Sequence, residues 1–187
     1  MANDCCGVMR VVSKDKGAIK RLCSIMCYKD PEYFCYRVRG FSCLEGGSLD
    51  DAIAKQGELY VCDFETDAAW SSNAWFNGED SPDRLIVDGY DEENRPIYGT
   101  AHLISVDRLC RKLGLGVELY ATEPGCGFCE HFLANRDGEL VFNETAGYTQ
   151  EYPIGEDGEY DYSQEPVEKT EMELWEFSTP EEIYFGE

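Results

Sequence analysis

Apolar residues recur at helical spacing in two segments of the chain, residues 14–29 and residues 105–113. Each segment follows a serine that can cap a helix, Ser13 or Ser105, and the second segment ends at Gly114. Basic side chains occupy intervening positions of the first segment, as on the exposed side of an amphipathic helix. The pattern predicts two helices packed on a sheet, and the side chains that we expect to be buried there are Leu22, Met26, Leu109 and Leu113.

Alternating and β-branched stretches between and after these segments predict strands. A short helix from 51 to 55 is expected after Ser48, which can cap it. Residues 77–99 are rich in Gly, Pro, Asp, Glu and Asn, so we expect an inserted loop or small hairpin. The predicted strands are Cys6–Ser13, Tyr33–Leu44, Glu58–Ala69, Val117–Thr122, Phe128–Ala134, Leu140–Phe142 and Glu171–Phe177.

These elements follow the order strand, helix, strand, strand, helix, strand, and then a hairpin. That is the split β-α-β order of the ferredoxin-like fold. We therefore predict the α+β class: an antiparallel sheet with its helices on one face, plus a C-terminal hairpin and an acidic extension. The 187 residues suit one domain with an extension. We place the domain at residues 1–147 and the aromatic-rich acidic extension, packed on the sheet or extending it, at residues 148–187.

Three blocks within residues 1–145 share a pattern with a known family. They are MANxC at 1–5 followed by a strand, FETDAAWS at 64–71, and LYATEPGCGF at 119–128 followed by a short hairpin. Together they resemble the YubB-type ferredoxin-like domain family of plasmid- and phage-borne proteins. In that family prolines follow the Trp-Ser pair, whereas Ser72-Asn73-Ala74 and an inserted loop follow it here. The resemblance implies a ferredoxin-like fold and a mobile-element origin, and it implies no activity.

Charge is distributed very unevenly along the chain, whose formal net charge is −22. The segment from Arg10 to Arg39 holds eight basic and three acidic residues, whereas residues 151–187 hold thirteen acidic residues and one lysine. A strongly anionic surface repels nucleic acid and anionic membranes and attracts basic proteins. We therefore expect a basic nucleic-acid-binding protein as partner, with no direct binding of nucleic acid or membrane.

The sequence favours a reducing compartment. No apolar run approaches the ~20 residues that a membrane-spanning helix needs, and no basic segment followed by an apolar one marks a secretory signal at the N-terminus. Most of the cysteines lie within apolar patterns, where a free thiol packs as a small hydrophobe. We expect the cytoplasm of a bacterial host cell. The ten cysteines are Cys5, Cys6, Cys23, Cys27, Cys35, Cys43, Cys62, Cys110, Cys126 and Cys129.

Cys126, Cys129 and His131 are the candidates for metal or thiol chemistry, because they lie close together in the sequence. A structural zinc site requires a fourth ligand. A redox dithiol requires its first cysteine at a helix N-terminus, whereas a strand is predicted here. Packed thiols are the simpler interpretation, so we predict free thiols, no bound metal and no cofactor. A zinc- or thiol-dependent enzyme built on these three residues stays as the alternative.

The chain contains no nucleophile elbow, P-loop or dinucleotide-binding glycine motif, so we predict that it is not an enzyme. Carboxylates on predicted strands could pair for acid–base chemistry or bind a divalent cation. With 38 acidic residues, however, chance pairs are expected. The carboxylates in question are Glu65, Asp67, Glu118 and Glu123.

Aromatic residues among polar ones supply the candidate partner-binding surface. Trp70 and Trp75 flank a polar turn, where they form either a binding lip or a cover over one end of the sheet. Tyrosines and a tryptophan also alternate with acids after residue 147, which is unlike a plain disordered acidic tail. The predicted partner-binding residues are Trp70, Trp75, Glu156, Asp157, Glu159, Tyr160, Asp161, Glu165 and Trp175.

These observations favour a non-catalytic acidic inhibitor or decoy from a phage or other mobile element. Such a protein would occupy the nucleic-acid site of a basic host protein, for example a CRISPR effector nuclease, because carboxylates along strands and loops imitate a phosphate track. A second alternative is a homo-oligomer in which the basic strip from Arg10 to Arg39 of one copy meets the acidic third of another.

Overall fold

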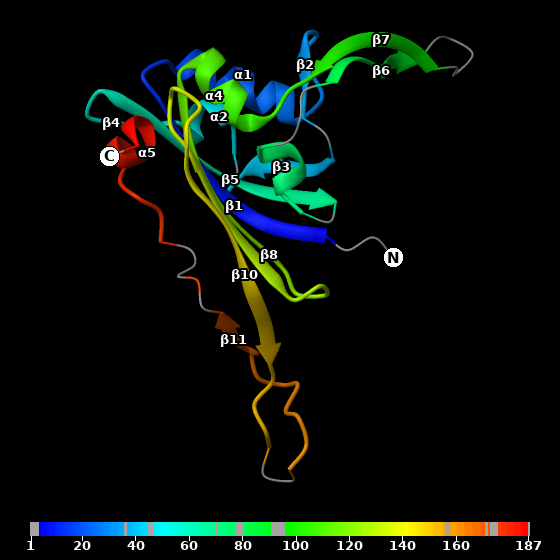
Figure 1. The fold of residues 1–187 in the computed structure, drawn as a ribbon, viewed down its shortest axis with the longest axis vertical. Coiled ribbons are helices and arrows are strands. Elements are labelled where there is room, and N and C mark those ends of the chain that lie inside the picture. Colours follow the sequence, from blue (N-terminus) through cyan, green and yellow to red (C-terminus); the bar gives the residue numbers. More distant parts are fainter. Residues whose placement is uncertain are drawn as a thin grey trace.

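The chain forms a mixed α+β structure dominated by one antiparallel sheet (Figure 1). The computed structural model describes residues 4–35, 37–44, 47–69, 71–77, 81–90, 96–155, 158–170, 172 and 176–186, and gives the backbone alone for residues 74, 81–90 and 96–100. The helices in these ranges are α1 (Lys16–Met26), α2 (Leu49–Ala52), α3 (Asn73–Phe76), α4 (Val106–Leu113) and α5 (Pro180–Phe185).

The main sheet has eight strands in the order β11-β10-β9-β8-β1-β5-β3, with the short β4 paired to β5. β1 lies between β5 and β8 and is antiparallel to both. A smaller sheet has the order β2-β7-β6. The strands are β1 (Asp4–Ser13), β2 (Tyr33–Phe34), β3 (Val38–Cys43), β4 (Ala54–Gln56), β5 (Leu59–Ala69), β6 (Ser81–Tyr90), β7 (Pro96–Leu103), β8 (Leu115–Glu123), β9 (Phe128–Ala134), β10 (Leu140–Glu151) and β11 (Val167–Thr170).

Side chains alternate between the two faces of the main sheet, and each face has its own apolar cluster. Val11 of β1 packs with α1, α3 and α4 in the larger cluster. Val12, the next residue, packs on the opposite face with Ile183 and Tyr184 of α5. The prediction that the helices around 14–29 and 105–113 share one face is therefore confirmed by α1 and α4, whereas α5, a helix that was not predicted, lies on the other face.

The expected core residues are buried, with one exception. Leu22 and Leu109 have no exposed surface and Met26 is 1% exposed, whereas Leu113 is half-buried at the edge of the same cluster. Gly114 ends α4 in the left-handed conformation, with φ 66°, as its position predicts. The cap of α1 differs from the prediction, because Asp15 accepts the bond from the Gly17 amide, at 2.7 Å.

Three other predictions need adjustment, and one is confirmed. The expected strand at 33–44 is interrupted at Arg37, whose φ of 65° turns the chain from the smaller sheet into the main one. The short helix spans 49–52 instead of 51–55, since β4 begins at Ala54. The inserted segment forms a hairpin, β6–β7, which confirms the hairpin alternative of the prediction. The expected strand at 171–177 lies partly outside the described residues, and none of its described residues, Met172, Glu176 and Phe177, is in a strand.

Candidate functional site

Residues 148–170 form a long hairpin, called here the arm, that projects from the body of the molecule (Figure 1). At its base β10 and β11 pair in register from Tyr148 opposite Thr170 to Glu151 opposite Val167. Farther out, Ile154 and Tyr160 form an isolated bridge, and the Asp161 amide donates to the Pro153 carbonyl, at 2.7 Å. The arm is thus built as an extension of the main sheet.

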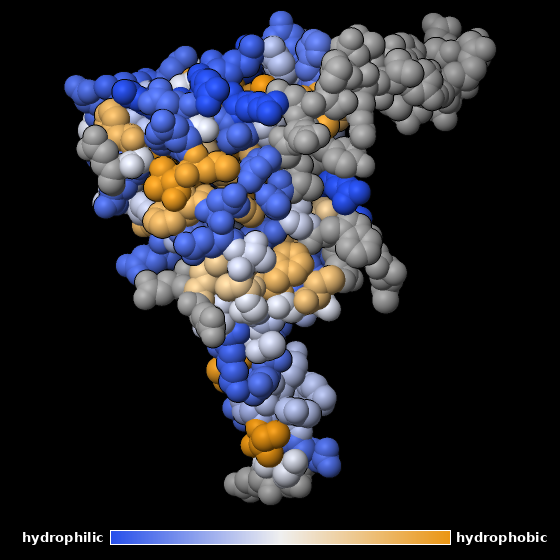
Figure 2. Space-filling view, viewed as in Figure 1, coloured by the Kyte–Doolittle hydropathy of each residue, from blue (hydrophilic) through white to orange (hydrophobic). Residues whose placement is uncertain are grey.

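The surface of the arm combines exposed apolar side chains with an excess of acidic residues. Tyr162 is 73% exposed, Ile154 61% and Tyr160 55%. The ring centroids of Tyr152 and Tyr162 lie 4.8 Å apart. Across residues 148–170 the sequence has seven acidic residues and one lysine, a net charge of −6. Figure 2 shows hydrophilic residues covering most of the arm, with isolated apolar spots among them.

Hydrogen bonds hold two carboxylates of the arm in place. Asp161 accepts bonds from the Ser163 hydroxyl and the Gln164 amide, both at 2.6 Å, and these donors lower the pKa of Asp161. At the base, the Tyr148 hydroxyl donates to Glu168 at 2.6 Å. Burial raises the pKa of Tyr148 to about 12, and the Glu168 carboxylate adds to the rise. The arm therefore stays anionic and anchored near neutral pH.

The structure places four of the predicted partner-binding residues on the arm: Glu159, Tyr160, Asp161 and Glu165. All four lie in its outer part, beyond the paired base. The list of predicted partner-binding residues left out the exposed Ile154 and Tyr162 beside them, although Tyr162 is one of the tyrosines that alternate with acids in the sequence. The predicted residues Trp70, Glu156, Asp157 and Trp175 lie outside the described residues.

The prediction of a binding lip at Trp75 is wrong, because Trp75 is only 1% exposed. It lies in α3, and its ring packs against Phe76, which in turn stacks on Phe132 of β9 with centroids 5.1 Å apart. A buried carboxylate holds this turn, since Glu130 accepts a bond from the Ser72 amide at 2.8 Å and another from the Ser71 hydroxyl. The tryptophan therefore belongs to the core.

Cys126, Cys129 and His131 are not brought together. Cys126 is exposed in the turn before β9, whereas the Cys129 thiol is buried beside the Thr170 hydroxyl, at 3.1 Å. The His131 ring lies between Tyr120 and Phe142, and its Nε2 contacts Glu118 at 2.8 Å. In the described part of the chain, no group of three or more Cys, His, Asp or Glu side chains is arranged to hold a metal ion.

Glu118 anchors the C-terminal segment to the sheet. Its side chain has no exposed surface, and it accepts bonds from the Ser178 amide at 2.8 Å and the Ser178 hydroxyl at 3.1 Å as well as contacting His131. A catalytic serine–histidine pair would require the Ser178 hydroxyl to hydrogen-bond the His131 imidazole. Here both groups bond the same carboxylate, so the arrangement fastens residues 176–186 to β8.

The basic strip is largely neutralised within the chain. At least six of its eight lysines and arginines form ion pairs with described residues, and the Arg10–Asp63 pair is bidentate, at 2.7 and 2.8 Å. Hydrogen bonding to Asp63 raises the pKa of Arg10. The pairs are Arg10–Asp63, Lys14–Glu58, Lys16–Asp50, Lys20–Asp50, Arg21–Asp30, Arg21–Glu32 and Arg39–Asp4.

The thiols of the core are poorly disposed to react. Burial raises the pKa of Cys5, Cys23 and Cys62 to about 12 in each case. A thiol with so high a pKa is almost entirely protonated at neutral pH, and the thiolate is the reactive form. Cys6 and Cys126 are exposed, whereas Cys23, Cys27 and Cys43 are half-buried and the other five cysteines are buried.

Helices of the length and apolarity required to cross a bilayer are absent from the residues that the structure describes. Compared with models of protein families, with curated proteins and with solved structures, the chain has no match.

Proposed function

We propose that this chain is a non-catalytic acidic binding protein that places its arm in the nucleic-acid site of a basic protein. The observation that carries the proposal is the projecting arm, on which exposed tyrosines stand among carboxylates with a net charge of −6. Carboxylates distributed along a narrow hairpin present negative charge at intervals, as a nucleic-acid backbone does. Tyrosine supplies contact area at low cost in conformational entropy and is enriched at interfaces.

The ion pairs of the basic strip favour a foreign partner over self-association. Charges already engaged within the chain, such as Arg10 with Asp63, have little capacity left for the arm of a second copy. Single exposed ion pairs contribute little to stability, but together they reduce the positive field that would attract an acidic arm. The basic side chains of a foreign partner are not occupied by the acids of this chain, so they can pair with the arm.

We infer further that residues 4–123 form a ferredoxin-like unit of mobile-element origin. The order β8-β1-β5-β3, with α1 after β1 and α4 before β8, supports this inference, since the split β-α-β arrangement predicts the same neighbours. The resemblance to YubB-type domains supports it as well. A protein of that origin acts inside a bacterial host cell, where CRISPR effector nucleases present strongly positive channels.

A competition assay tests the proposal. A basic nucleic-acid-binding protein, a CRISPR effector nuclease first, is mixed with labelled nucleic acid and increasing amounts of the chain. We expect the chain to displace the nucleic acid while binding none itself, with an association rate that falls steeply as salt rises.

Variants then assign the effect to the arm. Reversing Glu159, Asp161 and Glu165 to Lys should slow association at least about tenfold at low salt. Replacing Tyr160 and Tyr162 by Ala should mainly speed release. The matched control reverses three acids outside the arm, Glu58, Asp137 and Glu181. Equal competition by the arm and control variants, or tight binding of nucleic acid by the chain at physiological salt, would contradict the proposal.

A further inference from the structure

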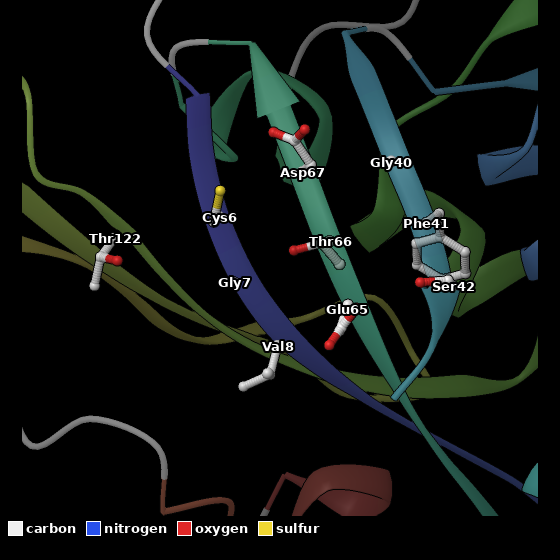
Figure 3. A pocket seen from close by; sticks show the side chains of 10 residues that line it. All are labelled: Cys6, Gly7, Val8, Gly40, Phe41, Ser42, Glu65, Thr66, Asp67 and Thr122. Atoms are coloured by element: carbon white, nitrogen blue, oxygen red, sulfur yellow. The ribbon is translucent and has the colours of Figure 1, made fainter. Parts of the chain in front are cut away.

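The face of the main sheet that carries α5 is left open at its opposite end, where it forms a hollow of about 440 Å³ (Figure 3). The register explains which side chains lie there. Cys6 of β1 lies opposite Thr122 of β8 and Asp67 of β5, and Asp67 in turn lies opposite Gly40 of β3. The next row along the strands contains Tyr120, Val8, Glu65 and Ser42.

Small residues around a carboxylate create this hollow. Gly40 has no side chain where it faces Asp67, and a Cβ built at Gly40 would lie 3.2 Å from the Asp67 Cβ. Cys6, Thr122 and Ser42 are also small, so the face is recessed between the taller side chains around it. Half-buried Val8 gives the hollow an apolar side.

The hollow carries negative charge that the described residues neutralise only in part. One carboxylate oxygen of Asp67, Oδ1, is buried and has no hydrogen-bond partner among them. Glu65 is exposed beside it and forms no ion pair with a described residue. Arg39 is near enough to act electrostatically on Asp67, but its guanidinium bonds Asp4, and Arg10 bonds Asp63. Burial and the nearby Asp4 raise the pKa of Asp67, and Arg39 lowers it by a smaller amount, as expected for an acid whose charge is only partly compensated.

The hollow also lies at the end of the sheet from which the arm extends. The row of cross-strand neighbours that contains Thr122 continues to Cys129 of β9 and Ala146 of β10. Tyr148, at the base of the arm, is two residues beyond Ala146. At 4.8 Å between strands, β5 and β10 are separated by about 19 Å. A protein held by the arm therefore has this hollow within reach.

We propose that the hollow binds the guanidinium group of an arginine from the basic partner, with Asp67 and Glu65 as its acceptors. Asp67 and Glu65 alternate along one strand, with their Cα atoms about 6.6 Å apart. A planar guanidinium has five donors and can bond carboxylates on two of its edges, whereas an ammonium group is a compact point charge. The apolar stem of the arginine would lie along Val8. The inference rests on the proposed function for the identity of the partner, but the binding chemistry of the hollow can be measured without one.

The test is a titration of N-acetyl-arginine amide into the full chain labelled with ¹⁵N, at low and physiological salt. We expect saturable shifts of the amide signals of Cys6, Ser42 and Asp67. The neutral isostere N-acetyl-citrulline amide should produce much smaller shifts. Asp67→Asn, which keeps the size of the side chain, should weaken the affinity about three- to tenfold, as expected for loss of a partly shielded ion pair. Glu65→Gln should act in the same direction.

Glu181→Gln is the matched control, because it removes one charge from α5, over the other end of this face. Shifts that grow without saturation, or that are equal for arginine and citrulline, would refute the inference. Unchanged affinity in both hollow variants would refute it as well. If arginine fails to saturate the hollow while the arm variants displace nucleic acid less well than the unchanged chain, this inference is wrong and the proposed function stands. If arginine saturates the hollow and the arm variants compete fully, the proposed function is wrong.

Discussion

Gly116 of β8 lies directly beneath α5, and we predict that Gly116→Ala loosens this helix. A Cβ at Gly116 would lie 2.8 Å from the Tyr184 Cα and closer still to the Ile183 carbonyl oxygen. Both contacts are with backbone, so no side-chain rotation relieves them. The methyl group can be accommodated only if α5 moves away from the sheet.

The size of the effect follows from what α5 buries. Ile183 is fully buried and Tyr184 is 6% exposed, both against the apolar cluster around Val12. Complete loss of this burial would cost about 3–6 kcal/mol at 1.5–3 kcal/mol for each side chain. A displaced helix keeps part of its contacts and regains conformational entropy. We therefore expect a decrease of about 2–4 kcal/mol in the free energy of unfolding.

Denaturant unfolding measures the loss, and hydrogen exchange of the amides of residues 180–186 locates it. Gly147→Ala is the matched control, because Gly147 also lies in a strand and nothing is within 4 Å of its Cβ position. That variant should change stability by no more than about 0.5 kcal/mol. If Gly116→Ala were as stable as Gly147→Ala and exchange in α5 were unchanged, the packing of α5 on β8 described above would be incorrect.

Three further predictions concern the core, the thiols and pH. Leu22→Ala should cost about 2–5 kcal/mol in denaturant unfolding and Leu113→Ala clearly less, since Leu113 is half-buried; equal losses would contradict the assigned burial. Thiol titration of the denatured, unreduced chain should find ten thiols and metal analysis no stoichiometric zinc, and in the folded protein Cys6 and Cys126 should react first. Far fewer thiols, or one zinc per chain, would show that the cysteines were misjudged. The pKa of Tyr148 is about 12 when folded against an ordinary value of 10.0, so the unfolded chain loses this proton first and stability should fall between about pH 10 and 12. Tyr148→Phe should show a smaller fall over that range, and parallel curves would count against the assigned hydroxyl environment.

Local periodicity was sufficient to predict most of the fold. The helical spacing around Leu22 and Leu109 depends only on neighbouring residues, and so does the left-handed cap at Gly114. The break at Arg37 could not be predicted in this way, because it arises where the chain passes from one sheet to another. The helix α5 did have a local signal, since Thr179 and Glu182 form a capping box with Pro180 at the first turn.

The sequence predicted the exposed residues of the candidate site correctly only where composition alone determines whether a side chain is exposed. Acids and tyrosines of the arm extend beyond the core, so their exposure follows from charge and position. Trp75 lies in an equally polar stretch, yet it is buried because Phe132 and Glu130, far along the chain on β9, hold its turn against the core. The hollow is formed by side chains that become neighbours only when strands from different parts of the sequence pair, as Gly40 does with Asp67. The sequence of one segment therefore gives no sign of it.

The packing of α5 has a consequence for how the chain acquires its structure during synthesis. Val12, Leu59 and Val61 are made early, whereas the residues that cover them, Ile183 and Tyr184, come near the end of the described chain. Contacts of such large sequence separation form slowly, because a long loop must close first. Until residues 176–186 have been made, or after proteolytic loss of them, a paired β1 and β5 present an uncovered apolar surface that favours aggregation. The yield of native protein is therefore expected to depend on this short segment, whatever the partner.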